Sequence, residues 1–256
     1  MLHLSIRRVC HLFMLITIIV VCALWLGLMR HSNTLWKIIS QQCIPNQEQK
    51  NNPAPCSEVN KKAGFVVYKD RQGPLQYLLI PTTKITGIES PELLVATTPN
   101  FFAQAWQARK FMANKYGSSI MDADISLAIN SQYGRSQNQL HIHISCLSPK
   151  VKAKLANLEA SFQPQWQRLP GGLLNHDYIA RRVRVNELQQ QGVFRLLAEE
   201  VEGAKENMGS YGLAMTSLSN GDFLLLATQR NLLKFNLASA EEIQDHQCQT
   251  LFYQLE

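Results

Sequence analysis

Two histidines separated by a single residue stand near the middle of the chain, in the segment QNQLHIHIS, residues 137–145. Alternate side chains of a β-strand point to the same side, so four polar residues of this segment share one face. They are Gln139, His141, His143 and Ser145. The apolar alternates, which we assign to the core, are Leu140, Ile142, Ile144 and Cys146. The sequence therefore predicts a strand that is backed by the core and presents a row of polar groups.

Three interpretations of His141 and His143 are open. The first is two exposed or hydrogen-bonded histidines with no chemical role. The second is a metal site, but His-x-His supplies two ligands and a site needs a third and usually a fourth. His176 and Asp177 are candidates for these, although nothing in the sequence ties them to the strand. The third is covalent catalysis, in which a neutral imidazole nitrogen attacks phosphorus and a second group donates hydrogen bonds to the oxygens.

The residues just before the histidines favour phosphate chemistry over metal binding. Gly134, Ser136 and Gln137 lie where the strand is expected to begin, and a glycine turn with short polar side chains can hold phosphate oxygens. Asn130 ends the preceding apolar segment. It is a candidate for a phosphate contact, and as a common turn former it also has a purely structural interpretation.

The elements that must position these residues follow from apolar periodicity and from turn residues. Strands are expected over residues 125–130 and 138–147, joined as a hairpin. Helices are expected over 99–116, 186–208 and 239–253, the last opened by a capping box. Two further hairpins resemble each other and predict an internal repeat of residues 64–116 and 212–253, unless they merely share turn chemistry. This mixture predicts the α+β class with a mostly antiparallel sheet and packed helices.

Composition limits the partners. Of the 256 residues, 46% are hydrophobic and 17% are charged, which is typical of a folded chain with a substantial core. The net charge of +6 suits an anionic partner such as phosphate or a membrane surface. The sequence contains no zinc finger, no aromatic-glycine RNA signature and no long basic run, so we expect no nucleic-acid partner.

The N-terminal region contains an apolar run over residues 9–29, long enough for a helix to span a bilayer. The run ends without a small-x-small cleavage site, which favours one transmembrane helix over a cleaved signal peptide. This predicts a cytoplasmic segment over residues 1–8, a tether or stapled loop over 30–62 and a catalytic domain over 63–256.

Four cysteines lie outside this apolar run, an even number that fits disulfides in an oxidising compartment such as the periplasm. Four cysteines allow three pairings. We favour Cys43–Cys56, which closes a short polar loop, together with Cys146–Cys248, which ties the histidine strand to the expected C-terminal helix. The alternative is four free thiols in a cytoplasmic domain.

A resemblance to a known family sharpens these expectations. SQNQLHIHIS looks like the strand of the histidine-triad superfamily, whose pattern is His-φ-His-φ-His with φ apolar. Beyond that motif, the chain from about residue 34 to 248 resembles the bacterial CDP-diacylglycerol pyrophosphatases. The segments that carry this resemblance include CIPNQ, GPLQYLLIPT, TPNFF, LAINS, HIHISC, GSYGLAM, LLATQRNLL and SAEEIQDHQC.

The resemblance implies a single-pass enzyme of the cell inner membrane with a histidine-triad-like fold, which hydrolyses CDP-diacylglycerol to CMP and phosphatidate through a CMP-histidine intermediate. His141 takes the position of the nucleophile, His143 that of its helper, and Gln139 stands where the family pattern has histidine. Glutamine keeps a donor and an acceptor, so we expect activity to survive this departure. Neither a metal nor another cofactor is expected. The predicted substrate-binding residues are Asn130, Ser136, Gln137 and Gln139.

Two other functions are compatible with the residues alone. The same histidine chemistry serves a nucleotide-sugar pyrophosphatase or a CMP transferase. A membrane-anchored binding module without catalysis is the other alternative. The expected partners are CDP-diacylglycerol and the lipid bilayer, and the sequence leaves monomer and dimer equally open.

Overall fold

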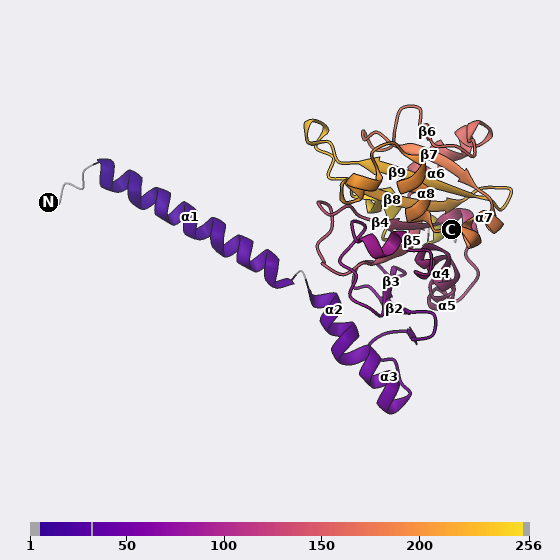
Figure 1. The fold of residues 1–256 in the computed structure, drawn as a ribbon, viewed down its shortest axis with the longest axis horizontal. Coiled ribbons are helices and arrows are strands. Elements are labelled where there is room, and N and C mark those ends of the chain that lie inside the picture. The colour runs from indigo at the N-terminus through magenta and orange to yellow at the C-terminus, as the bar shows by residue number, and fades with distance from the viewer. Residues whose placement is uncertain (1–5, 32, 253–256) are drawn as a thin grey trace.

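The computed structural model describes residues 6–31 and 33–252 (Figure 1). Residues 1–5 of the predicted N-terminal segment 1–8, and Tyr253 at the end of the predicted last helix, lie outside the described residues. The strands are β1 Glu58–Asn60, β2 Phe65–Lys69, β3 Tyr77–Pro81, β4 Ile125–Ile129, β5 Ile142–Leu147, β6 Gln167–Arg168, β7 Ile179–Val183, β8 Tyr211–Ser217, β9 Phe223–Gln229 and β10 Gln244–Asp245.

Helices account for much of the remaining chain, and tighter or wider helical turns are labelled η. The α-helices are α1 Ile6–His31, α2 Thr34–Ile38, α3 Ile44–Lys50, α4 Phe101–Ala108, α5 Lys110–Tyr116, α6 Pro149–Leu158, α7 Val185–Gln190, α8 Val193–Glu200 and α9 Gln249–Phe252. The η turns are η1 Ile39–Cys43, η2 Pro91–Leu94, η3 Asp122–Asp124, η4 Glu159–Ser161, η5 Lys205–Ser210, η6 Leu232–Lys234 and η7 Ala240–Ile243.

One antiparallel sheet organises the molecule, which confirms the predicted α+β class. Its order is β1-β2-β3-β5-β4-β8-β9-β7-β6, and β10 pairs with the end of β5. The order is symmetric about the central β4–β8 pair. On one side β2-β3-α4-β4-β5 form a unit, and on the other β6-β7-α8-β8-β9 form a unit with the same internal strand order. In the predicted repeat, the hairpin β8–β9 corresponds to β2–β3. In the sheet, the strands at the positions equivalent to β2 and β3 are β6 and β7.

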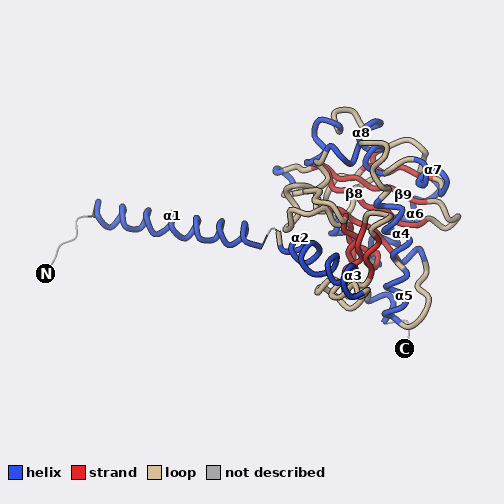
Figure 2. Tube along the Cα trace, turned by 60° about the horizontal axis from the view of Figure 1, so that its bottom comes forward, coloured by secondary structure: helices blue, strands red, loops and turns tan. Residues whose placement is uncertain are grey.

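The two faces of the sheet are covered differently. One face carries a continuous core formed with α4, α5 and α8, to which β4, β5, β8 and β9 all contribute. The opposite face carries two separate apolar clusters. One involves β8, β9 and α6, and the other involves β2, β3, α2 and η1. Figure 2 shows strands lying between α2–α3 and α4–α5. The gap between the two clusters is the place where this face can hold polar groups.

The prediction that residues 9–29 form a transmembrane helix is wrong. Crossing a bilayer core takes about 20 consecutive, predominantly apolar residues in a helix. No helix in the described part of the chain is both long and apolar enough to meet that requirement, and this includes α1, which covers the predicted span 9–29.

Three other segments differ from expectation. The predicted tether over residues 30–62 is helical from Thr34 to Lys50. The single helix expected over 186–208 is divided into α7, α8 and η5, because the chain is extended at Gln191–Gly192 and turns at Gly203 with φ of 70°. The C-terminal helix expected from Ser239 is replaced by η7, β10 and the short α9. Helix α4, in contrast, lies within its predicted range.

Candidate active site

Strand β5 places the two histidines in the gap between the apolar clusters. His143 lies opposite Leu78 of β3 and Ala128 of β4, one from each cluster. His141 directly precedes the strand, and the two rings lie edge to face with their centroids 4.8 Å apart. Both side chains line a cavity of about 450 Å³. The predicted alternation is confirmed, since Leu140, Ile142, Ile144 and Cys146 all belong to the core on the other face.

The tautomer of His141 follows from one contact. Its Nδ1 lies 2.7 Å from the backbone carbonyl oxygen of Gln139. A carbonyl can only accept a hydrogen bond, so Nδ1 carries the proton and Nε2 keeps its lone pair. Burial, followed by the neighbouring His143, lowers the pKa of His141 from 6.5 to about 4. At neutral pH the ring is therefore uncharged, with Nε2 as a nucleophilic nitrogen.

His143 is held through its Nδ1, which lies 3.0 Å from the Gln76 amide nitrogen and 3.1 Å from Glu241 Oε1. The amide nitrogen can only donate and the carboxylate can only accept, so the two contacts favour opposite tautomers. Burial lowers the pKa of His143 to about 4, although the charge of Asp70 acts in the opposite direction. Nε2 is buried and has no hydrogen-bond partner among the described residues, so its hydrogen-bonding capacity is unused in this structure.

Glu241 connects the groups around His143. Asn130 donates from Nδ2 to Glu241 Oε2 at 2.9 Å, and the Glu241 backbone N–H donates back to Asn130 Oδ1 at 3.0 Å. His246 Nε2 lies 3.3 Å from Glu241 Oε1. The Gln76 amide also donates to Asp70 Oδ2 at 3.0 Å. Asn130 thus reaches the cavity as a fixed partner of a carboxylate.

The turn before β5 forms another wall of the cavity. Gly134, Ser136 and Gln137 line it, and Gln137 Oε1 accepts a hydrogen bond from the Leu35 backbone N–H at 3.1 Å. Arg135 is directed elsewhere, because its guanidinium makes a two-pronged ion pair with Glu89 at 2.6 and 2.7 Å. This ion pair fixes the turn against the segment before η2.

Gln139 is the predicted substrate-binding residue that the structure places apart from the cavity lining. Its side chain is fully buried. The amide nitrogen donates to the backbone carbonyls of Thr83 at 2.9 Å and Pro81 at 3.3 Å. The contact of Gln139 with the histidine pair is made by its main-chain carbonyl, which accepts a hydrogen bond from His141 Nδ1.

Several residues of the site were missed by sequence reasoning. Asp70 and Arg71, just after β2, and Glu241 line the cavity, while Gln76 and His246 support it. The signal that could have found three of them is the family resemblance. GPLQYLLIPT contains Gln76, and SAEEIQDHQC contains Glu241 and His246. No group of three or more His, Cys, Asp or Glu side chains suited to a metal ion occurs among the described residues.

Comparison with known proteins decides the family. Residues 30–252 match the family described as CDP-diacylglycerol pyrophosphatase. The chain is 64% identical to the CDP-diacylglycerol pyrophosphatase of Yersinia pestis over 242 residues, which cover 93% of this chain and 94% of that protein. The chain belongs to the CDP-diacylglycerol pyrophosphatase family. This confirms the family resemblance, while the predicted residue roles and the histidine-triad superfamily stay predictions.

Both favoured disulfides are present in this member of the CDP-diacylglycerol pyrophosphatase family. Cys43–Cys56 closes the segment after η1, and Cys146–Cys248 joins β5 to the C-terminal segment.

The backbone of the β2–β3 turn approaches the backbone of His246 closely. Gly73, with φ of 62°, lies where a Cβ would be 1.9 Å from the His246 carbonyl oxygen. Only glycine fits there without a backbone shift, and the contact holds the β2–β3 turn beside Glu241 and His246.

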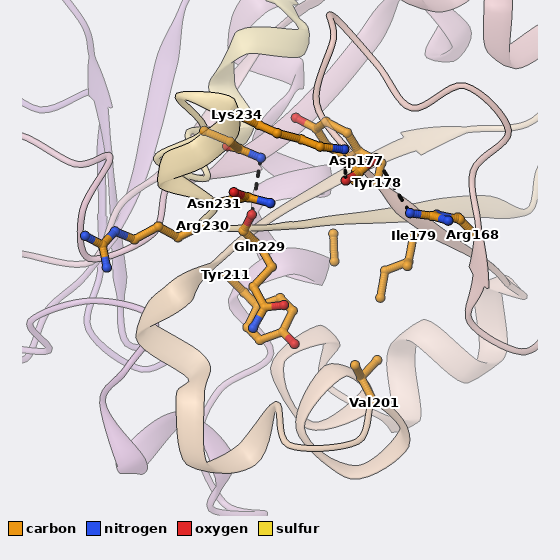
Figure 3. A pocket seen from close by; sticks show the side chains of 12 residues that line it. Arg168, Asp177, Tyr178, Ile179, Val201, Tyr211, Gln229, Arg230, Asn231 and Lys234 are labelled. Atoms are coloured by element: carbon orange, nitrogen blue, oxygen red, sulfur yellow. Dashed lines mark hydrogen bonds and ion pairs between the residues drawn. The ribbon is translucent and has the colours of Figure 1, made fainter.

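A second cavity, of about 300 Å³, lies away from the histidines of this CDP-diacylglycerol pyrophosphatase family member (Figure 3). It contains none of the predicted catalytic or substrate-binding residues, although Asp177, a candidate metal ligand from the sequence, lines it. Lys234 and Arg168 meet the carboxylate of Asp177 at one side, with Lys234 Nζ 2.6 Å and Arg168 Nη2 3.9 Å from it. Arg230 contributes a further cation to the lining. This cavity carries positive charge but no nucleophile of the kind found at β5.

Proposed function

We propose that His141 is the nucleophile with which this chain hydrolyses CDP-diacylglycerol. Family membership makes the chain a hydrolase of the pyrophosphate bond of this lipid. The observation that carries the residue assignment is the hydrogen bond from His141 Nδ1 to the Gln139 carbonyl. It directs the lone pair to Nε2, while the lowered pKa keeps that nitrogen unprotonated at neutral pH.

The first step joins His141 Nε2 to the phosphorus of the CMP moiety and breaks the bond from that phosphorus to the bridging oxygen. The electron pair leaves with phosphatidate, which is a phosphate monoester and a good leaving group. The imidazole becomes positively charged as the N–P bond forms. Its Nδ1–H already donates to a carbonyl dipole, which stabilises that charge in a buried site. Water then attacks the same phosphorus, the N–P bond breaks with its electron pair returning to Nε2, and the proton lost by water passes to solvent, which releases CMP and restores neutral His141.

His143 acts as the helper in this scheme. The Gln76 amide donates to Nδ1 in this scheme, which places the proton of the neutral ring on Nε2, the ring nitrogen that has no partner among the described residues. With its proton on Nε2 it donates a hydrogen bond to an oxygen on which negative charge increases in the transition state. Arg71 in the cavity lining adds positive charge for the pyrophosphate. Ser136, Gln137 and Asn130 complete the proposed substrate contacts.

The test is to trap the intermediate. Substrate carrying a label in the CMP moiety is mixed with enzyme, quenched in base and analysed for labelled protein. We expect a base-stable, acid-labile adduct on His141 that His141→Ala lacks. His143→Ala should still form the adduct, but more slowly, by roughly 10²–10³ as for loss of one transition-state donor. A fully active His141→Ala enzyme contradicts the assignment.

The two disulfides support the proposal that this domain works in an oxidising compartment, such as the periplasm. Disulfides form and persist in such compartments and are rare where thiols are kept reduced. Labelling of free thiols in protein taken directly from cells, with and without prior reduction, tests this. Cys146 and Cys248 should react only after reduction.

A further inference from the structure

A short loop between β9 and η7 exposes apolar side chains to an unusual degree. Leu233 is 94% exposed and Phe235 is 91% exposed, with Leu232 and Leu237 also exposed. We call these four residues the apolar tip. Single exposed apolar residues are ordinary on a soluble surface, whereas several together mark a surface that meets a partner or a membrane.

The apolar tip is held rigidly, so the exposure is not that of a loose loop. Asn231 and Asn236 exchange two backbone hydrogen bonds at its base, of 2.8 and 2.9 Å. The buried Asn236 side chain donates to Thr228 Oγ1 at 2.8 Å. Phe235 has a left-handed backbone with φ of 52°, which is unfavourable for a bulky side chain. The fold therefore holds an aromatic ring outward at a position where glycine or asparagine would be less strained.

Positive charge accompanies the apolar tip. Lys234 lies within it, Arg230 precedes it, and both line the second cavity with Arg168 (Figure 3). Lys234 and Arg168 both form ion pairs with the carboxylate of Asp177. Exposed leucine and phenylalanine flanked by lysine and arginine are the side chains that settle in the interface of a bilayer with anionic headgroups.

The root of the apolar tip adjoins the catalytic cavity. The Ser131 hydroxyl donates to the Leu237 carbonyl, and the Ser131 backbone N–H donates to the Ala238 carbonyl at 3.0 Å. Asn130, the preceding residue, lines the cavity. Four residues beyond Leu237 the same segment supplies Glu241, the carboxylate beside His143. A surface that contacts lipid here would bring the bilayer next to the cavity.

We propose that the apolar tip inserts into the surface of an anionic bilayer and presents the lipid substrate to the catalytic cavity. The occupant is a lipid surface and not a second protein, because the apolar groups are fringed by cations and adjoin the site for a lipid with an anionic headgroup. The proposal rests on the proposed function for its purpose, but contact between tip and bilayer is measurable without any turnover.

Contact is tested in the full chain with Leu233→Trp and the matched control Met121→Trp, whose side chain is 59% exposed in the native protein. Native tryptophans are common to both variants, so the difference in emission reports the added residue. Vesicles of phosphatidylethanolamine and phosphatidylglycerol with brominated acyl chains are the probe. We expect quenching and a blue shift at position 233 and neither at 121, with weaker quenching in purely zwitterionic vesicles. Equal emission changes at the two positions overturn the proposal.

Turnover is tested with Leu233→Glu/Phe235→Glu against the control Met121→Glu/Val185→Glu. The tip variant should lose activity on CDP-diacylglycerol in vesicles, roughly ten-fold per apolar side chain withdrawn from lipid, and stay within about two-fold on substrate in detergent micelles. Equal losses on both substrates overturn the proposal. So does a native dimer that the tip variant dissociates, because a second copy would then be the occupant. Failure of the proposed function is distinguishable, since an active His141→Ala enzyme leaves the tryptophan result unchanged.

Discussion

The rate of hydrolysis should stay constant as the pH is lowered to a value at which an ordinary histidine would already be protonated. The perturbation is pH alone. At about pH 5.5, a histidine with the ordinary pKa of 6.5 is only about one tenth neutral, whereas one with a pKa of about 4 is about 97% neutral. If His141 must be neutral to attack, kcat/KM should fall by only a few per cent between neutral pH and pH 5.5. An unshifted nucleophile would lose about ten-fold over that range.

The assay is kcat/KM for CMP release from substrate in detergent micelles from pH 8 down to about pH 4, with His141→Ala as the blank. The two rings are coupled, so an acid limb near pH 4 belongs to the pair and not to one ring. A ten-fold fall per pH unit that begins near pH 6.5 would refute the argument from burial. Circular dichroism at each pH shows whether the enzyme is still folded.

Stability changes over the same range, which makes the folding control necessary. Both histidines have a folded pKa of about 4, below the unfolded value of 6.5, so the unfolded chain binds more protons between these values. The free energy of unfolding therefore falls as pH drops through this window, by about 1.4 kcal/mol per histidine at pH 5.5. Denaturant titrations at pH 7.5 and 5.5 measure this loss, and equal midpoints would contradict it.

Three substitutions extend the argument. Glu241→Gln removes the charge 3.1 Å from His143 Nδ1 and should lower kcat by about ten- to hundred-fold with little change in KM, and unchanged kcat would remove this carboxylate from the mechanism. Replacing both Cys146 and Cys248 by serine removes a crosslink that spans 102 residues. The free energy of unfolding, measured by denaturant titration, should fall by about 4–5 kcal/mol, and an unchanged midpoint would show that the disulfide does not stabilise the fold. Gln139→Leu leaves two backbone carbonyls without their donor and should lower stability by about 1–3 kcal/mol while kcat stays near the native value, and loss of kcat with intact stability would assign the side chain to substrate.

The histidine strand was predictable because period-two alternation is a local property of the sequence. The apolar residues Leu140, Ile142 and Ile144 pack into the core on one face of the strand. The polar residues that alternate with them therefore lie on the opposite face. The partners of the histidines were not predictable in this way. Gln76 and Glu241 reach His143 from 67 and 98 positions away along the chain, and only the strand order β3-β5-β4 and the path of η7 bring them together.

The C-terminal segment shows how tertiary contacts override a local signal. A capping box at Ser239 favoured a helix. In the structure β10 pairs with β5, and the buried Gln244 amide donates to the Ser126 carbonyl at 2.9 Å. The crosslink from Cys248 to β5 holds the following residues in place. These contacts are available only once β4 and β5 have formed the sheet, so helical propensity in this segment could not decide its structure.

The contacts of Gln139 explain why glutamine can stand at the first position of the motif, where the family pattern has histidine. Its contribution to His141 is a main-chain carbonyl, which any residue supplies. The side chain has a different task, because it must give hydrogens to the carbonyls of Pro81 and Thr83 in a fully buried place. A glutamine amide has two hydrogens for this, whereas a neutral histidine has one. The residue type at position 139 is therefore determined by the hydrogen bonds that its side chain makes to the buried loop. The tautomer of His141 depends only on the main-chain carbonyl of that position. Gln139→His should for this reason keep its catalytic rate and lose stability instead.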